Sequence, residues 1–245
     1  MAGIRKAVLF DLYGTLADVR VDEEAARFWA VLALEAFGQG WHVSGQELRD
    51  LYLRLLHEVA GEHAEGFMLD AVFAGLLVSC DIDPAPAAVA AFARTFRRLS
   101  LARLEKKSYS DDLLRTVRNA GYALGLVSNT EALLTDYDLE ILGLHDHFDA
   151  VVLSSRVGFK KPDRGIFDLA LRRLGVAASE CVFVGDNPVD DIAGAQGAGM
   201  DALYLAAGDG TRSLSVAAGR RVLQAGFDLG EILAALRELG FKIQL

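Results

Sequence analysis

Ala7-Val8-Leu9-Phe10-Asp11-Leu12-Tyr13-Gly14-Thr15-Leu16 is the stretch from which the fold can be worked out. Four apolar residues lead directly to a lone carboxylate, Asp11, and a Gly-Thr pair follows shortly after it. A short, continuous apolar run predicts a strand that is buried on both faces, as in a parallel sheet covered by helices. Asp11 is then either a turn former at the end of this strand or a residue that does chemistry there.

Similar apolar runs recur after residue 120, and each ends in small or acidic residues. These predicted strands are Tyr122–Ser128, Ala150–Ser155, Cys181–Asp186 and Ala202–Leu205. Helical patterns lie between them, at Ala132–Leu142, Gly165–Leu174 and Asp191–Ala198. The alternation of strands and helices predicts an α/β fold with a parallel sheet and crossover helices.

A long helical segment separates the first predicted strand from the others. Apolar residues at helical spacing mark Glu23–Phe37, Ser44–Val59, Leu69–Ser79 and Pro86–Leu104. The segment is too long for a crossover loop, so residues 18–105 are predicted to form an inserted α-helical domain. Residues 1–17 and 106–245 are then predicted to form the sheet domain. A helix predicted from Ser110 to Ala120 returns the chain from the insertion to the sheet.

The composition excludes several kinds of partner. With 34 acidic and 25 basic residues, the net charge is −9, which argues against binding to nucleic acid or to an anionic membrane. The longest uncharged apolar run, Ala71–Cys80, is far short of the ~20 residues of a membrane span. Cys80 and Cys181 lie in apolar runs, which favours core positions in a reducing compartment. We therefore expect a cytoplasmic protein, and the sequence offers no prediction of its oligomeric state.

Polar residues follow several of the predicted strands. The carboxyl ends of parallel strands meet at one edge of an open sheet, where ligands bind. Asp11 and Asp186 are therefore expected to converge there, together with either Asp190 or Asp191. Carboxylates this close together repel one another, and oxygen-only ligands favour Mg²⁺ as the compensating cation.

Other groups at this edge suit a phosphate-sized anion. Lys161 adds a positive charge, and the hydroxyl of Ser128 is a hydrogen-bond donor. The backbone N–H groups of the turn from Asp11 to Thr15 are further donors. A carboxylate, a metal ion and donors around such a space suit covalent catalysis through an aspartyl intermediate.

Four segments in order resemble the motifs of the haloacid dehalogenase-like hydrolase superfamily. They are Asp11-Leu12-Tyr13-Gly14-Thr15-Leu16, Leu126-Val127-Ser128-Asn129, Lys161-Pro162-Asp163, and Val184-Gly185-Asp186-Asn187-Pro188-Val189-Asp190-Asp191-Ile192-Ala193-Gly194-Ala195. The resemblance covers nearly all of a Rossmann-like core, and the helical insertion resembles the cap domain of that family.

The resemblance implies a role for each matching residue. Asp11 would be the nucleophile, and Ser128 and Lys161 would stabilise the transferred group. The residues that it implies for substrate binding are Tyr13, Gly14, Thr15 and Asn129, and those for Mg²⁺ are Asp11, the Tyr13 carbonyl, Asp186 and Asp191. Asp191 fits the last acidic position of the family better than Asp190 does.

Tyr13 departs from the phosphatases of this superfamily, which carry a second Asp two residues after the nucleophile as acid and base. A phenol with an ordinary pKa of ~10 can donate a proton but is a poor base near neutrality. Tyr at this position resembles the metal-independent 2-haloacid dehalogenases instead. In the fourth motif, those enzymes have Ser-Asn at the place where this chain has Gly185-Asp186. Tyr13 in the first motif therefore favours a dehalogenase, and Asp186 in the fourth motif favours a phosphatase.

We give the carboxylate of Asp186 the greater weight, since next to Asp11 it calls for a cation. The sequence thus predicts a Mg²⁺-dependent phosphatase of a small phosphorylated metabolite. A 2-haloacid dehalogenase is the alternative enzyme. A third hypothesis is a protein that binds phosphate or Mg²⁺ with little turnover.

Overall fold

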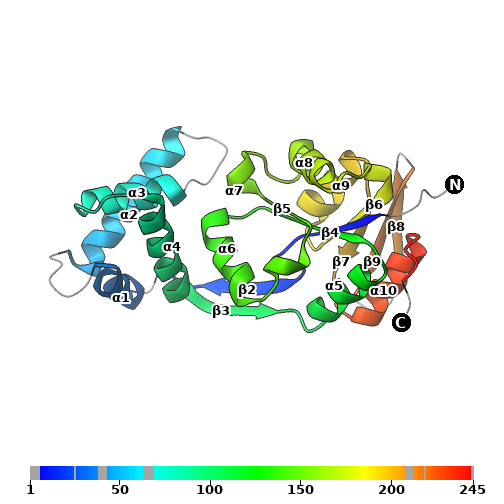
Figure 1. The fold of residues 1–245 in the computed structure, drawn as a ribbon, viewed down its shortest axis with the longest axis horizontal. Coiled ribbons are helices and arrows are strands. Elements are labelled where there is room, and N and C mark those ends of the chain that lie inside the picture. The colour runs from blue at the N-terminus through cyan, green and yellow to red at the C-terminus, as the bar shows by residue number, and fades with distance from the viewer. Residues whose placement is uncertain are drawn as a thin grey trace. The chain divides into compact units, whose positions relative to one another are not determined.

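The computed structural model of the chain describes residues 6–24, 26–37, 43–62, 69–207, 212–217 and 219–243. The chain divides into two compact units, shown in Figure 1. The core unit contains Met1–Asp18, Glu105–Thr130 and Leu142–Leu245, and the helical unit contains Val19–Leu104 and Glu131–Ile141.

The core unit holds most of the strands. Its elements are β1 (Ala7–Phe10), α5 (Ser110–Asn119), β4 (Ala123–Ser128), η1 (His145–His147), β5 (Ala150–Leu153), α7 (Ser154–Val157), α8 (Arg164–Leu174), η2 (Ala178–Glu180), β6 (Cys181–Gly185), η3 (Pro188–Ala193), α9 (Gly194–Gly197), β7 (Asp201–Leu205), β8 (Arg212–Ala217), β9 (Arg220–Ala225) and α10 (Leu229–Glu238). The helical unit contains α1 (Ala26–Phe37), α2 (Gly45–Glu62), α3 (Leu69–Ser79), α4 (Pro86–Ser100) and α6 (Ala132–Ile141). The unit boundaries near residues 18 and 105 fall within β2 (Ala17–Val21) and β3 (Leu101–Lys106), which form a two-stranded sheet.

Within the described residues, the sheet of the core unit has seven strands in the order β5-β4-β1-β6-β7-β9-β8. All neighbouring pairs are parallel except β8 and β9, which are antiparallel. β1 is central, with Ala7 opposite Ala123 on one side and Cys181 on the other, and all four of its residues are buried. This confirms the predicted α/β fold, because a strand with two neighbours and two covered faces must be apolar throughout.

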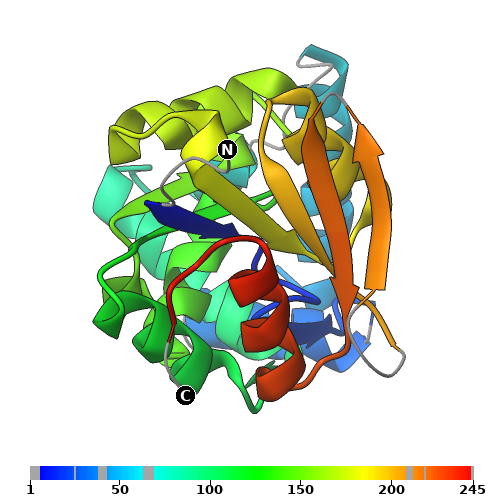
Figure 2. The same ribbon diagram turned by 90° about the vertical axis from the view of Figure 1, so that its right-hand side faces the viewer.

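Helices cover both faces of this sheet, as Figure 2 shows. α8, α9 and η3 pack on one face, and α5 and α10 pack on the other. Phe167 of α8 meets Phe183 of β6 edge to face, with 5.3 Å between the ring centroids. Both side chains are fully buried, so the helix and the strand are held in a fixed relation next to the end of β6.

The strand order reverses at β1. From β1 the chain moves outward through β4 to β5, and then returns to the other side of β1 to form β6. Parallel sheets bind ligands at such a switch point, outside the carboxyl ends of the strands. The residues that follow β1 and β6, Asp11 and Asp186, lie at this point.

The helical unit is organised around a buried aromatic cluster. Phe28, Trp29, Phe73 and Phe96 come from three different helices, and neighbouring ring centroids are 5.0 to 6.0 Å apart. We expected α6 to stay with the sheet, but it belongs to this unit. Its residue Asp138 is fully buried in a bidentate ion pair with Arg97 of α4.

The helix expected at Pro86–Leu104 ends earlier than its pattern suggested. The backbone turns extended at Leu101 (φ −69°, ψ 112°), and Leu101–Lys106 becomes β3. Leu101, Leu104 and Lys106 of β3 are half-buried, and the other three residues are exposed. The spacing of Leu101 and Leu104 is also compatible with a helix, so the sequence pattern does not show where α4 ends.

β8, β9 and α10 lie beyond the last predicted strand. A signal for α10 was present in the sequence, because Asp228 and Glu231 have the spacing of a capping box. The Asp228 side chain accepts a hydrogen bond from the Glu231 N–H, and the Glu231 carboxylate accepts one from the Gly226 N–H. Among the helices in the described ranges, none has the length and hydropathy needed to cross a membrane.

Candidate active site

A polar cavity of about 170 Å³ lies at the switch point of the sheet. Its lining residues follow β1, β4 and β6 or belong to the loop before α8: Asp11, Tyr13, Ser128, Asn129, Thr130, Lys161, Asp186, Asn187, Asp190 and Asp191. The structure therefore brings seven of the predicted site residues together. Gly14 and Thr15, which we also predicted, are not among these lining residues.

Asp11 extends from the end of β1 and is only 8% exposed. Its N–H donates to the Val184 carbonyl of β6, which fixes its main chain between two strands. The Ser128 hydroxyl donates to Oδ1 of Asp11 at 3.0 Å, and the Lys161 ammonium donates to the same oxygen at 2.6 Å. Two donors on one oxygen hold the Asp11 carboxylate in a fixed position, as a nucleophile requires.

Lys161 is the cation of the site and is 3% exposed. Its Nζ contacts Asp11 and Asp191 at 2.6 Å each and lies 5.3 Å from the ring centroid of Phe183. Burial lowers the pKa of Lys161, but the two carboxylates outweigh burial and hold the pKa above its usual value. Lys161 thus remains charged near neutrality.

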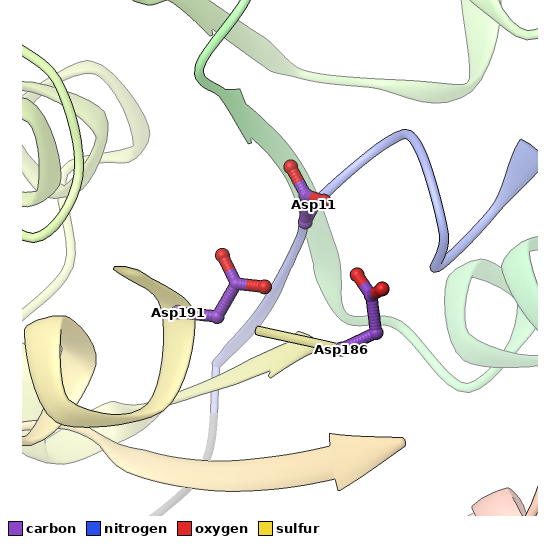
Figure 3. Close-up of side chains that lie close together, drawn as sticks. All are labelled: Asp11, Asp186 and Asp191. Carbon is purple, nitrogen blue, oxygen red and sulfur yellow. The ribbon is translucent and has the colours of Figure 1, made fainter. Parts of the chain in front are cut away.

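Three carboxylates lie close together in Figure 3: Asp11, Asp186 and Asp191. One oxygen of each lies within 4.8 Å of an oxygen of the other two. Burial raises the pKa of Asp186, and the charge of Asp11 raises it further, although a hydrogen bond from Thr15 opposes the change. Burial likewise raises the pKa of Asp191, against the opposing effect of Lys161. The group therefore holds more negative charge than one ammonium compensates.

The turn after β1 is shaped around Asp186. Gly14 has φ +87°, and a Cβ atom there would overlap the Asp186 carboxylate. The Gly14 N–H donates to the Ala17 carbonyl at 2.8 Å, and the Thr15 hydroxyl donates to Asp186 Oδ1 at 3.0 Å. These two groups thus close the turn and hold Asp186, and the role of Gly14 and Thr15 in substrate binding stays a prediction.

Asp191 and Asp190 are adjacent but differ in their surroundings. Both belong to η3, a π-helical segment that follows β6. Asp191 is fully buried, and its Oδ2 accepts from the Asn187 N–H at 2.9 Å. Asp190 is partly exposed, and its Oδ2 lies 3.4 Å from the side-chain nitrogens of Asn129 and Asn187. Only Asp191 joins the group of three carboxylates.

Asn187 lines the cavity, and the sequence predicts no role for it. Its side chain accepts hydrogen bonds from the N–H groups of Val189 and Asp190, at 2.9 and 3.0 Å, and so begins η3. An Asn directly before Pro188 is a recognisable signal for the start of a helix. The polar residues at the end of β5 do not reach the cavity lining. Ser154 donates to the Thr130 carbonyl instead.

The lining combines the groups needed to transfer a phosphate-sized anion. Asp11 is a buried nucleophile candidate, Ser128 and Lys161 are donors bonded to it, and Asp186 and Asp191 are oxygen ligands for a hard cation. Tyr13, two residues after Asp11 in the sequence, lines the same cavity.

Sequence comparison connects these residues with known proteins. A family model described as haloacid dehalogenase-like hydrolase matches residues 5–199, which include all the lining residues. A protein named glyceraldehyde 3-phosphate phosphatase, from Methanopyrus kandleri, is 36% identical over 197 residues. The match covers 80% of this chain and 81% of that protein.

Solved structures with this fold include both enzyme classes considered above. A 2-haloacid dehalogenase from Pseudomonas syringae pv. Tomato DC3000 is 27% identical, with a TM-score of 0.60 over 96% of this chain and 99% of that one. A phosphatase from Thermococcus onnurineus is 25% identical, with a TM-score of 0.56 over 94% and 97% of the two chains. Similarity of fold alone therefore does not separate the two reactions, and the residues of the cavity must do so.

Proposed function

Because the chain belongs to the haloacid dehalogenase-like hydrolases, we propose that it is a Mg²⁺-dependent phosphatase that forms an aspartyl phosphate on Asp11. The observation that carries the proposal is the carboxylate of Asp186, within reach of Asp11 and Asp191. The relative with 36% identity bears the name of a phosphatase of a small phosphorylated sugar derivative, which supports the same substrate class. A cytoplasmic location remains part of this proposal.

The residues present fit a Mg²⁺ ion. Three carboxylates face one ammonium group in a mostly buried site, and burial raises the pKa of two of these carboxylates. A divalent cation removes this excess charge, and oxygen ligands without His or Cys suit Mg²⁺. Asp11, Asp186 and Asp191 would hold it, with the Tyr13 carbonyl as a further ligand. When bound, the ion would neutralise charge on the phosphoryl group and polarise it.

In the first step, a carboxylate oxygen of Asp11 attacks phosphorus. A bond forms between that oxygen and phosphorus while the bond from phosphorus to the leaving-group oxygen breaks. Ser128 and Lys161 both donate to Oδ1, so we expect Oδ2 to be the attacking atom. Lys161 also contributes positive charge next to the transferred group.

In the second step, water attacks phosphorus and the aspartyl phosphate is hydrolysed. The bond between phosphorus and Asp11 breaks, inorganic phosphate leaves, and the carboxylate is restored. Tyr13 stands where an acid–base Asp would serve both steps, and its phenol is a poor base near neutrality. We therefore expect the best substrates to have leaving groups that need little protonation, such as acyl phosphates.

Tyr13 is the specific observation that favours a second candidate, a 2-haloacid dehalogenase. In that reaction Asp11 would displace halide from carbon and form an ester, which water would then hydrolyse. The similar structure of a dehalogenase from Pseudomonas syringae is consistent with this alternative. Asp186 argues against it, because a second carboxylate next to Asp11 adds negative charge that a metal-independent reaction would leave uncompensated.

The test measures phosphate release from acetyl phosphate, p-nitrophenyl phosphate and glyceraldehyde 3-phosphate, with Mg²⁺ or with EDTA. We expect Mg²⁺-dependent turnover that Asp11→Asn abolishes, since an amide is a poor nucleophile. Asp11→Asn must keep the thermal midpoint of the wild type for the comparison to be valid. If all three substrates are inert, L-2-chloropropionate with halide detection tests the dehalogenase. If neither phosphate nor halide is released, the remaining hypothesis is a protein that binds phosphate or Mg²⁺ with little turnover.

A further inference from the structure

The side-chain amide of Asn129 pairs with the main chain of Lys161, 32 residues further along the chain. Oδ1 of Asn129 accepts the Lys161 N–H at 2.7 Å, and Nδ2 of Asn129 donates to the Lys161 carbonyl at 2.9 Å. One side chain therefore makes the two hydrogen bonds that a neighbouring strand would otherwise make to a residue.

The loop that carries Lys161 needs such an anchor. It lies between α7 and α8 and has no strand or helix of its own at residues 159–163. One local bond, from the Asp163 N–H to the Lys160 carbonyl at 2.8 Å, closes the turn. Asn129 supplies bonds from outside the loop, and it follows β4 directly, so its own main chain is fixed by the sheet.

The position of this loop determines where the Lys161 ammonium can lie. Nζ contacts Asp11 and Asp191 at 2.6 Å, and both contacts are buried. A shift of the Lys161 main chain would lengthen or misalign these short contacts, because a buried Lys side chain has little room to change rotamer and compensate. Asn129 is thus connected to Asp11 through Lys161.

We propose that Asn129 is a positioning residue for Lys161, and not the substrate-binding residue that the sequence suggested. Both polar groups of its side chain are already bonded to Lys161, with Asp190 as a weaker additional acceptor for Nδ2 at 3.4 Å. The inference rests on the proposed function, since it assigns Asn129 to the same reaction.

A double-mutant cycle with Asn129→Ala and Lys161→Gln tests this role. The readout is kcat and KM for acetyl phosphate and p-nitrophenyl phosphate with Mg²⁺. We expect Asn129→Ala to lower kcat about 10- to 100-fold, since misplacement by about 1 Å costs on this order. KM should change less than about threefold, and the loss should be equal for both substrates. In the Lys161→Gln background, Asn129→Ala should cost nothing further, as for groups that act as one unit.

Three outcomes separate the possibilities. If the two losses multiply in the double variant, or if the loss from Asn129→Ala depends on the leaving group, Asn129 acts on the substrate and the inference fails. If the wild type does not turn over either phosphate, the proposed function itself fails. The Lys161→Gln variant retains a donor for the two carboxylates. If the Lys161→Gln variant does not fold, Lys161→Arg takes its place in the cycle.

Asn119→Ala is the matched control for the loss of an Asn side chain. Asn119 is exposed at the end of α5 and is not among the lining residues of the cavity. We expect wild-type kcat and KM for this variant. Thermal midpoints of all variants show whether each protein is folded under the assay conditions.

Discussion

Gly14 permits the closest approach between two site segments, the turn after β1 and the residue that follows β6. Its φ of +87° is strained for any residue with a Cβ atom, and that atom would overlap the Asp186 carboxylate. One added methyl group would therefore cause both backbone strain and a steric clash with Asp186. Gly121, a second glycine of the core unit, allows the two effects to be measured separately.

We expect Gly14→Ala to lose about 1–3 kcal/mol of stability from backbone strain, and to lose Mg²⁺-dependent turnover as well, because Asp186 must move. Gly121→Ala is the control, since Gly121 has φ +85° and an added methyl group there would meet no atom within 4 Å. It should lose similar stability but keep its kcat. Urea denaturation and steady-state assays measure the two effects, and equal kcat values in both variants would contradict the prediction.

Asp186→Asn tests the cation requirement at a single residue. The amide keeps an acceptor oxygen for the Thr15 hydroxyl but removes the charge that faces Asp11. We expect Mg²⁺-stimulated kcat to fall by about 10² or more. In EDTA the variant should be at least as stable as the wild type, because burial and Asp11 both disfavour the charged form of Asp186. A lower melting temperature than that of the wild type in EDTA would refute this account.

The sequence predicts the carboxylates of the site well and their supporting groups poorly. Asp11 and Asp186 end buried strands, so the geometry of a parallel sheet brings them to one edge. The bonds of Asn129 to the Lys161 main chain and of Thr15 to Asp186 have no local signature. They depend on which loops meet in space, and pairs separated by 32 and 171 residues do not reveal this in a periodic pattern.

At the scale of elements, the helical unit holds α6 against α4 by two ion pairs of different burial. Arg97 and Asp138 are 6% and 0% exposed, and they form a bidentate pair. Arg94 and Glu140 connect the same two helices at the surface. α6 begins shortly after Asn129 and Thr130, so this unit is joined directly to a segment of the cavity lining.

We expect Arg97→Met to destabilise the protein by about 3–5 kcal/mol, since Asp138 would keep a buried charge without this guanidinium. Arg94→Met on the same helix should cost less than about 1 kcal/mol, because its partner is solvated. The double variant Arg97→Met, Asp138→Leu should recover most of the loss, as apolar replacements of buried pairs often do. Chemical denaturation followed by circular dichroism measures all three, and a double variant no more stable than Arg97→Met would overturn the prediction.

The elements that the sequence predicts are those with one dominant pattern. β1, β4 and β6 are continuous apolar runs between polar residues, and each is a strand of the sheet. β3 is missed because Leu101 and Leu104 continue the helical spacing of α4, and the strand is defined only by its pairing with β2. The helix α10 carries a capping signal at Asp228 and Glu231, but this is a short local pattern.

At the scale of the whole molecule, the protein is a hydrolase with a net charge of −9. A cation that binds only the folded state stabilises it in proportion to the logarithm of its concentration. We expect Mg²⁺ to raise the melting temperature, by the equivalent of about 2.7 kcal/mol at 100 times its dissociation constant. Differential scanning fluorimetry against MgCl₂ measures the shift.

The matched variant for this titration is Asp186→Asn, in which the shift should be largely absent. NaCl at equal ionic strength controls for general screening of the acidic surface. A shift of equal size in Asp186→Asn would mean that Mg²⁺ acts on the net charge of the protein and not at the site.

The central place of β1 also has a consequence for biosynthesis. β1 is synthesised well before both of its neighbours, residues 123–128 and 181–185. One edge of β1 stays unpaired until β4 is synthesised, and the other until β6 is synthesised. Unpaired apolar strand edges promote aggregation of nascent chains. The helical unit, whose segments up to Leu104 are synthesised in the interval, can fold locally while β1 waits. The acidic cluster, with members at residues 11, 186 and 191, therefore comes together only after residue 191 has been synthesised, and metal binding would report that β6 has paired with β1.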